Sequence, residues 1–241
     1  MRSLVIVPAR LASTRLPNKP LLKINGTSMI RRTLERVLAS GAAPVVLAAD
    51  DQRILDEAQG LEGVIPVITK VEHSCGTERV LEAYRKVSAD LGDFDVILNV
   101  QGDEPFIDPR MITQVLAQLP ERLKKASFLT SVTEITEAEQ ADPNVAKVVL
   151  DLDQNALIFT RERLERAYKH TSVYIYTPEF LETFCALPPS PLETAYRLEQ
   201  MRALDNGFKL NCIPLPFDAI SINDEGDLAK AGVKDFEVFA G

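Results

Sequence analysis

Short, continuous apolar runs that alternate with helical patterns constrain the fold of this chain more than any other feature. The runs consist mostly of aliphatic residues without polar alternation, and lie at 4–7, 44–48, 64–68 and 94–100. Segments with apolar residues at helical spacing lie between or after them, at 29–38, 52–58, 76–88 and 109–119. Strands that are apolar throughout are typical of a parallel sheet covered by helices on both faces. We therefore expect an α/β fold with a mixed, mostly parallel sheet that binds ligands at the carboxyl ends of its strands.

The second half of the chain has a different pattern. Four β-rich stretches follow one another with few helices between them, at 127–135, 145–150, 156–161 and 172–176. Helical patterns return at 178–187, 192–206 and 227–231, and a further strand is expected at 208–213. We expect a single domain over residues 1–241, with an antiparallel insertion at about 126–190.

Composition excludes several classes of protein. The 241 residues carry a formal charge of −8, whereas duplex nucleic acid requires a broad basic surface, so we expect no nucleic-acid partner. No apolar run approaches the roughly 20 residues of a membrane span. The three cysteines have no paired metal spacing, which argues against a disulfide framework or a zinc site and favours the cytoplasm; they are Cys75, Cys185 and Cys212.

The loop after the first apolar run is basic although the chain is acidic. In "VPARLASTRLPNKP", Arg10, Arg15 and Lys19 occur without any acidic residue, together with Ser13 and Thr14. Arginine binds phosphate oxygens in pairs and lysine supplies a compact charge, so this loop can wrap a polyphosphate. The motif of a Walker-type loop is missing. The alternative is a solvated loop that happens to be basic.

Two further clusters follow predicted strands. In "LNVQGDEPFIDP", Asp103 comes directly after a buried strand and Gly102, a suitable place for a Mg²⁺ ligand, with Glu104 as a neighbour. The alternative is a turn with capping acids. In "EHSCGTERV", Gly76 would let the backbone approach a base closely, or Thr77 would simply cap the next helix.

These clusters occur together and in order, and with them the chain resembles the 3-deoxy-manno-octulosonate (Kdo) cytidylyltransferases. The resemblance is carried by "PARLASTRLPNKPL", "AADDQRI", "CGTERV", "VQGDEPFI", "AKVVLD" and "PLETAYRLEQMRAL". It extends from about Val5 to Leu228. It implies a Rossmann-like, three-layer nucleotidyltransferase fold of the glycosyltransferase-A-like kind. It also implies a Mg²⁺-dependent homodimer that transfers CMP from CTP to a keto-sugar acid in lipopolysaccharide synthesis and releases pyrophosphate.

The resemblance assigns expected roles residue by residue. Arg10, Lys19 and Asp103 are the expected catalytic residues. The nucleotide is expected to contact Pro8, Ala9, Arg10, Ser13, Arg15, Lys19, Gly76 and Arg79. The sugar acid is expected to contact Gln101, His170, Glu193 and Gln200. The metal is expected at Asp103 and Asn223.

Several positions depart from the family pattern. Asn18 replaces a usual glycine, but asparagine also tolerates positive φ, so the loop can keep its shape. Asn223 stands where the family has a second metal carboxylate, and Asp224 beside it is a rival ligand. The segment between "FTR" and His170 is short, and Tyr196 replaces an expected glutamate. The nucleotide half therefore matches more closely than the sugar half.

These departures leave alternatives open. The acceptor could be Kdo, an amino-substituted Kdo or another keto-sugar acid. The chain could instead use another nucleotide with an aldose 1-phosphate, or it could be a nucleotide-binding relative that has lost activity. A flavodoxin-like redox protein is disfavoured, because the cofactor loop G-x-G-x-x-G is missing. Among these we expect a cytidylyltransferase whose acceptor is Kdo.

Overall fold

A computed structural model describes residues 1–13 and 15–239, except the side chain of Ser172. Thr14 of the basic loop lies outside the described residues. The chain divides into two compact units: unit 1 comprises residues 1–113 and 218–241, and unit 2 comprises residues 114–217. The predicted insertion at about 126–190 falls within unit 2.

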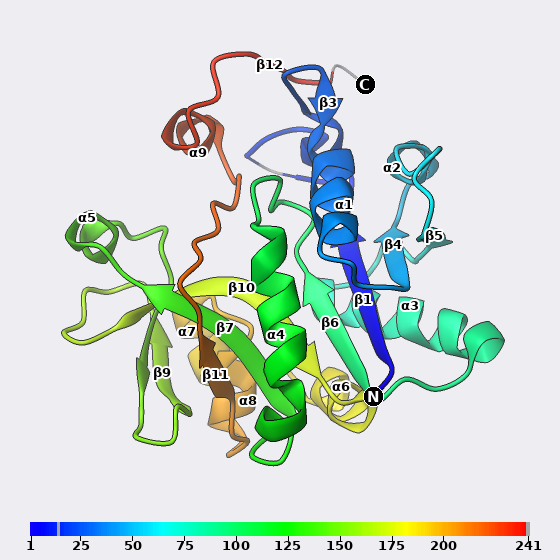
Figure 1. Cartoon of the computed structure of the whole chain (residues 1–241). Helices are drawn as coiled ribbons and strands as arrows, with labels where there is room; N and C mark the ends of the chain where they lie inside the picture. Colours follow the sequence, from blue (N-terminus) through cyan, green and yellow to red (C-terminus); the bar gives the residue numbers. More distant parts are fainter. Residues whose placement is uncertain (14, 240–241) are drawn as a thin grey trace. The chain divides into compact units, whose positions relative to one another are not determined.

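Unit 1 is built around a parallel sheet in the order β6-β1-β4-β5 (Figure 1). Val5 of β1 lies opposite Val45 of β4, and Leu4 lies opposite Ile97 of β6. The elements of this unit are β1 (Ser3–Ala9), η1 (Lys19–Leu21), β2 (Lys23–Ile24), β3 (Thr27–Ser28), α1 (Met29–Ala39), β4 (Val45–Ala49), α2 (Gln52–Asp56), β5 (Val64–Ile68), α3 (Gly76–Leu91), β6 (Val96–Val100), α9 (Glu225–Lys230) and β12 (Phe236–Glu237).

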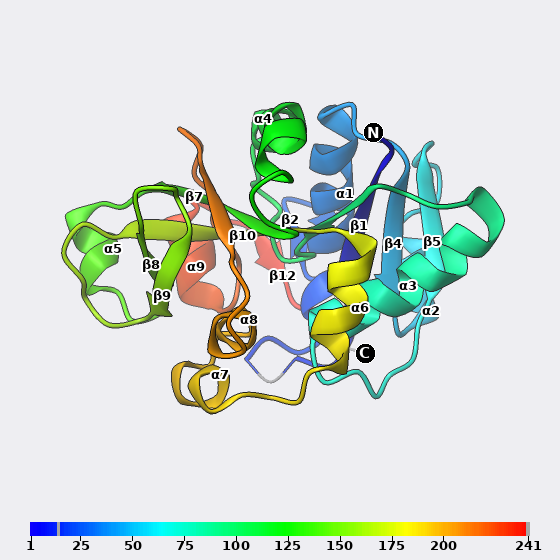
Figure 2. The same ribbon diagram turned by 90° about the horizontal axis from the view of Figure 1, so that it is seen from below.

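Helices cover both faces of this sheet, with α1 on one side and α3 on the other (Figure 2). The core residues of β1, β4 and β6 are almost completely buried, as continuous apolar strands require. Ser28 caps α1 by accepting a hydrogen bond from the Arg31 N–H group. The predicted α/β class with a mostly parallel, Rossmann-like sheet is therefore confirmed.

Unit 2 contains mainly antiparallel strands, as predicted. β10 pairs antiparallel with β7 and β8, β8 pairs antiparallel with β9, and β11 runs parallel to β7. The elements are β7 (Phe128–Glu134), α5 (Glu137–Ala141), β8 (Lys147–Leu150), β9 (Ala156–Thr160), β10 (Tyr168–Tyr176), α6 (Pro178–Ala186), α7 (Pro191–Tyr196), α8 (Met201–Asp205) and β11 (Asn211–Pro214). The helix α4 (Pro109–Arg122) spans the division between the units.

Three local predictions are corrected. The single helix expected over 192–206 is two helices, because Arg197 adopts a left-handed conformation (φ 54°) that ends α7. Cys75 rather than Thr77 is the N-cap residue of α3, and Thr77 lies buried in the first turn. The strand expected at 208–213 begins later, at Asn211.

Candidate active site

A cavity of about 290 Å³ opens in unit 1 where β1 and β6 end. After β1 the sheet continues to β4 on one side, whereas β6 lies on the other side, so this edge is the point at which strand order reverses. Such switch points are the usual ligand sites of open parallel sheets. Most of the predicted site residues line the cavity, namely Pro8, Ala9, Arg10, Ser13, Arg15, Lys19, Gly76, Arg79, Gln101, Asp103 and Asn223.

The loop after β1 brings its cations to this cavity. Asn18 holds the left-handed conformation expected of it (φ 52°) and immediately precedes the short helix η1, in which Lys19 lies. Arg10 and Arg15 are exposed, whereas Lys19 is partly buried. The guanidinium groups are therefore accessible to a ligand, while the lysine ammonium is held by the protein.

Lys19 lies between two oxygen ligands from distant parts of the chain. Its Nζ atom is 2.6 Å from Oδ2 of Asp103 and 3.4 Å from Oδ1 of Asn223. Asn223 Oδ1 also accepts a hydrogen bond of 3.2 Å from Arg15. A carboxylate and an amide oxygen that converge on one cation, with room for a substrate phosphate, form a donor set that fits Mg²⁺.

The rival metal ligand, Asp224, has another function in the structure. Its side chain caps α9 by accepting a hydrogen bond of 3.1 Å from the Asp227 N–H group, and Asp227 caps in return. Asn223 lines the cavity and Asp224 does not. Of these two residues, Asn223 is therefore the one whose side chain meets Lys19 and Arg15 at the cavity.

Gly102 allows the loop after β6 to approach β1 closely. A Cβ atom at this position would lie 2.7 Å from the Pro8 carbonyl oxygen, which is closer than atoms can pack. A Cβ atom at Gly76, by contrast, would make only ordinary contacts, the nearest being Gln101 Oε1 at 3.6 Å. Steric need for glycine at this edge is therefore strongest at Gly102.

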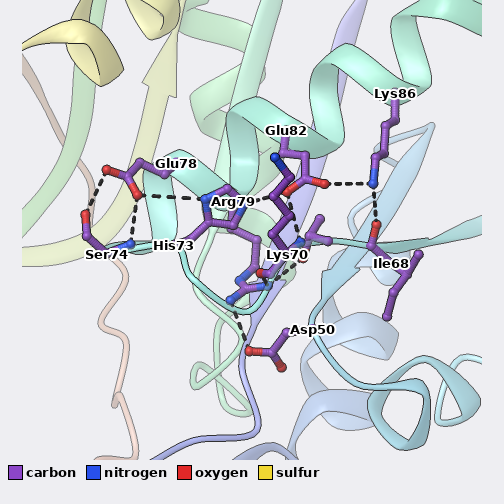
Figure 3. Close-up of polar contacts among 10 residues, drawn as sticks. Asp50, Ile68, Lys70, His73, Ser74, Glu78, Arg79, Glu82 and Lys86 are labelled. Carbon is purple, nitrogen blue, oxygen red and sulfur yellow. Dashed lines mark hydrogen bonds and ion pairs between the residues drawn. The ribbon is translucent and has the colours of Figure 1, made fainter.

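His73 and Ser74 also line the cavity, and helix α3 holds their loop (Figure 3). His73 Nε2 is 2.5 Å from a Glu82 carboxylate oxygen, and Ser74 donates hydrogen bonds from its N–H and hydroxyl groups to Glu78. Burial alone would raise the pKa of Glu82, but hydrogen bonds from Lys86, the Lys70 N–H group and His73 lower the pKa to about 2. The sequence predicts only that His73 lies in a loop. The four-residue spacing of Ser74, Glu78 and Glu82 is the signal from which the hydrogen bonds between this loop and α3 could have been predicted.

The remaining predicted sugar ligands belong to unit 2. His170 is buried in β10, where burial lowers the pKa of its imidazole to about 3 and keeps it neutral. Its Nε2 atom lies 2.8 Å from the Thr130 hydroxyl, which itself donates to the Val173 carbonyl, so His170 is the donor of the first bond. This histidine is therefore a neutral group with a fixed tautomer.

Glu193 and Gln200 are held by neighbours within unit 2. Glu193 forms an ion pair of 2.6 Å with Arg202 and completes a capping box with Ser190 at the start of α7. Gln200 is 2% exposed and accepts a hydrogen bond of 3.2 Å from the Tyr174 hydroxyl. Its Nε2 atom is buried and has no hydrogen-bond partner within the described residues, whereas Arg202 and Ser190 hold both carboxylate oxygens of Glu193.

The chain is similar to known cytidylyltransferases. A family model described as cytidylyltransferase matches residues 4–210. A 3-deoxy-manno-octulosonate cytidylyltransferase from Thioalkalivibrio sulfidiphilus is 42% identical over 226 residues, covering 86% of this chain and 88% of the relative. An 8-amino-3,8-dideoxy-manno-octulosonate cytidylyltransferase from Shewanella piezotolerans is 37% identical over 238 residues, covering 95% and 96%.

Solved structures show the same relationship. A CMP:2-keto-3-deoxy-manno-octonic acid synthetase complexed with CTP has a TM-score of 0.85 and 32% identity, and the match covers 96% of this chain and 97% of that one. HddC from Yersinia pseudotuberculosis, complexed with GMP-PN, has a TM-score of 0.68 at 15% identity, which is a likeness of fold alone. The expected nucleotidyltransferase fold is confirmed by the first of these structures.

Proposed function

The chain belongs to the cytidylyltransferase family, and on that basis we propose that it transfers CMP from CTP to the anomeric hydroxyl of Kdo. The anomeric oxygen forms a bond to the α-phosphorus, the bond between the α-phosphorus and the bridging oxygen breaks, and pyrophosphate leaves. The hydroxyl proton passes to solvent. The observation that carries the proposal is the cavity that Arg10, Arg15, Lys19 and Asp103 line together, with Lys19 bonded to Asp103.

Charge neutralisation and positioning account for most of the rate in phosphoryl and nucleotidyl transfer. Arg10 and Arg15 present guanidinium groups that can each bind two phosphate oxygens. Lys19 is already anchored on Asp103, so its ammonium needs little reorganisation to meet the developing charge of the leaving group. These residues also screen the negatively charged triphosphate from the carboxylate of the incoming sugar acid.

Asp103 and Asn223 are the residues that would hold Mg²⁺. A bound magnesium ion supplies Lewis-acid polarisation of phosphate oxygens and neutralises their charge. The protein offers one carboxylate and one neutral amide oxygen here, which leaves several coordination positions for phosphate and water. Lys19 lies next to both ligands and supplies a second positive charge at the same place.

The second candidate acceptor is the 8-amino analogue of Kdo. Relatives that are named for this sugar are 37–38% identical to the chain, and the matches cover 95% of it. We favour Kdo because the Thioalkalivibrio relative that bears its name is 42% identical. The two acceptors are separated by measuring kcat/KM for both; a higher value for the 8-amino sugar would transfer the assignment to that substrate.

A pyrophosphate-release assay tests the activity itself. We expect release only when CTP, Mg²⁺ and Kdo are all present, and we expect UTP, ATP and GTP to be poor substitutes. A preference for UTP or GTP would contradict the assignment of CTP. CTP binding without turnover for any 3-deoxy sugar acid would identify the protein as an inactive nucleotide-binding relative.

The proposal extends to the oligomeric state of the protein and to the compartment in which it acts. No helix among the described residues is long and apolar enough to cross a membrane. We propose a homodimer that acts in the cytoplasm, where CTP is available, and that supplies the activated sugar for lipopolysaccharide synthesis. Light scattering on the purified protein checks the dimer, and a molecular mass near the 26.7 kDa of one chain would contradict it.

A further inference from the structure

Asp50 directly follows β4, the strand that lies between β1 and β5 in the sheet. The loops after β1 and β5 both line the cavity. β4 ends at Ala49 and pairs with β1 on one side and with β5 on the other. The loop after β1 carries the cations, and the loop after β5 carries His73 and Ser74. A side chain at the end of β4 can therefore reach both loops without entering the cavity.

One carboxylate oxygen of Asp50 holds the loop after β1. Oδ1 accepts a hydrogen bond of 2.9 Å from the N–H group of Leu11, the residue next to Arg10. This contact joins positions that are 39 residues apart in the chain. It fixes the backbone at the point where the basic loop leaves the strand.

The other oxygen holds the loop after β5 through Arg79 (Figure 3). Oδ2 lies 3.1 Å from Nη2 of Arg79, and the two side chains are only 5% and 3% exposed. Arg79 in turn donates hydrogen bonds of 2.5 Å to the Thr69 hydroxyl and 3.0 Å to the Lys70 carbonyl oxygen. Burial lowers the pKa of Arg79, and the Asp50 charge opposes that shift and favours the charged guanidinium.

Asp51, the neighbouring acid, does something different. Its side chain accepts the Arg53 N–H group as the N-cap of α2 and pairs with the Arg53 guanidinium group, 2.9 Å away. Neither Asp50 nor Asp51 lines the cavity. The pair of acids in "AADDQRI" is thus divided between a helix cap and a bridge between loops.

We propose that Asp50 is a positioning residue that holds the loops after β1 and β5 in fixed alignment for a ligand that spans both. The inference rests on the proposed function, in which the triphosphate contacts the first loop and the cytidine contacts the second. Alignment before binding lowers the cost of ordering the loops. That benefit is full only for a ligand that touches both loops, which makes the bridge distinguishable from general structural support.

Calorimetric titration of CTP, CMP and pyrophosphate, each with Mg²⁺, tests the bridge. The Asp50→Asn variant keeps an acceptor for Leu11 but removes the charge opposite Arg79. We expect its Kd for CTP to rise about tenfold, while the Kd values for CMP and pyrophosphate rise by about twofold or less. In steady state we expect a higher KM for CTP with kcat and the KM for Kdo little changed.

Two further variants make the test decisive. Asp51→Asn is the matched control, and we expect all three ligands to bind it as they bind the wild type. Thr69→Val removes one Arg79 contact without leaving a buried charge unpaired; it should show the same selective loss for CTP in weaker form, even if Asp50→Asn does not fold. An unchanged Kd for CTP, or a rise in the Kd for CMP as large as the rise for CTP, would overturn the proposed role of Asp50. Wild-type protein that fails to bind CTP would instead contradict the proposed function itself.

Discussion

Asp103 is the residue on which activity should depend most. Among the described residues lining the cavity it is the one carboxylate, and it lies 2.6 Å from the Lys19 ammonium. Asp103→Asn keeps the shape but removes the charge that would hold Mg²⁺. We expect kcat to fall about a thousandfold, because a metal supplies several kcal/mol of stabilisation to the transition state.

Steady-state pyrophosphate release checks this prediction. Asp108→Asn is a suitable control, because Asp108 pairs with Arg110 outside the cavity. Turnover of Asp103→Asn within tenfold of the wild type would refute the metal role, and a similar loss in Asp108→Asn would show that the effect is not specific to the site.

Arg15 should matter for CTP handling rather than for stability. Its side chain is exposed, lines the cavity and donates to Asn223 at 3.2 Å. In Arg15→Ala a charge-assisted phosphate contact is lost, so we expect the KM for CTP to rise about tenfold. Arg15→Lys should recover part of the loss, because it restores the charge without the paired donors. Kinetic constants equal to the wild type in Arg15→Ala would contradict the phosphate contact.

At the residue scale, the sequence could place the groups that line the cavity but not those behind them. Arg10, Lys19 and Asp103 follow predicted strands, and parallel strands bring their carboxyl ends to one edge. Asp50 is polar and also follows such a strand, but its two hydrogen-bond partners depend on the direction of its side chain. The link from His73 to Glu82 likewise depends on the path of a loop, which periodicity does not describe.

At the scale of elements, α3 should give the protein an acid-sensitive contribution to stability. The pKa of Glu82 is lowered to about 2 from an ordinary value of 4.5, because hydrogen bonds from Lys86, Lys70 and His73 outweigh burial. A lowered pKa in the folded state means that the carboxylate stabilises the fold above about pH 4.5 and loses that effect as the pH falls toward 2. Glu82→Gln should therefore be less stable than the wild type at neutral pH.

Urea unfolding at a series of pH values checks this. We expect the difference in free energy of unfolding between wild type and Glu82→Gln to be largest at neutral pH and to narrow steadily below about pH 4.5. Glu179→Gln serves as the control on another helix, α6. A difference that stays constant from neutral pH to pH 3 would exclude the ionised carboxylate as its cause.

The elements themselves are predictable where one pattern extends over several residues. The strand at Val64–Ile68 has the bounds expected from the sequence, and the helix α1 agrees to within one residue. The break between α7 and α8 is not predictable in this way, because α7 ends at the left-handed conformation of Arg197 while apolar spacing continues across it. Helix ends that depend on the backbone conformation of one residue are therefore the part of the fold that is hardest to predict from the sequence.

At the scale of the whole molecule, unit 1 is completed by a segment from the end of the chain. Ile222 and Leu228 are fully buried in a cluster with Leu16, Leu22 and Met29, and Asn223 lies between them in sequence. Leu228→Ala should lower the free energy of unfolding by about 2–5 kcal/mol. It should also weaken CTP binding, since the same segment holds Asn223 beside Lys19.

Chemical denaturation and calorimetry measure the two effects of Leu228→Ala. Leu192→Ala is the control, because Leu192 is exposed and should change stability by no more than about 0.5 kcal/mol. A destabilised Leu228→Ala protein that binds CTP as tightly as the wild type would show that the segment supports the fold without supporting the site.

The residues that line the cavity and the predicted sugar ligand Gln200 belong to different units, so a change at Gln200 should affect CTP and Kdo differently. All described residues that line the cavity belong to unit 1, whereas Gln200 belongs to unit 2 and has an Nε2 atom without a partner among the described residues. Gln200→Leu should therefore leave the Kd for CTP unchanged and raise the KM for Kdo, by about tenfold if one hydrogen bond to the sugar acid is lost. Tyr174→Phe, which removes the hydroxyl that orients Gln200, should raise the KM for Kdo by a smaller factor. A weaker Kd for CTP in Gln200→Leu, or an unchanged KM for Kdo, would show that the sugar acid is not recognised through this residue.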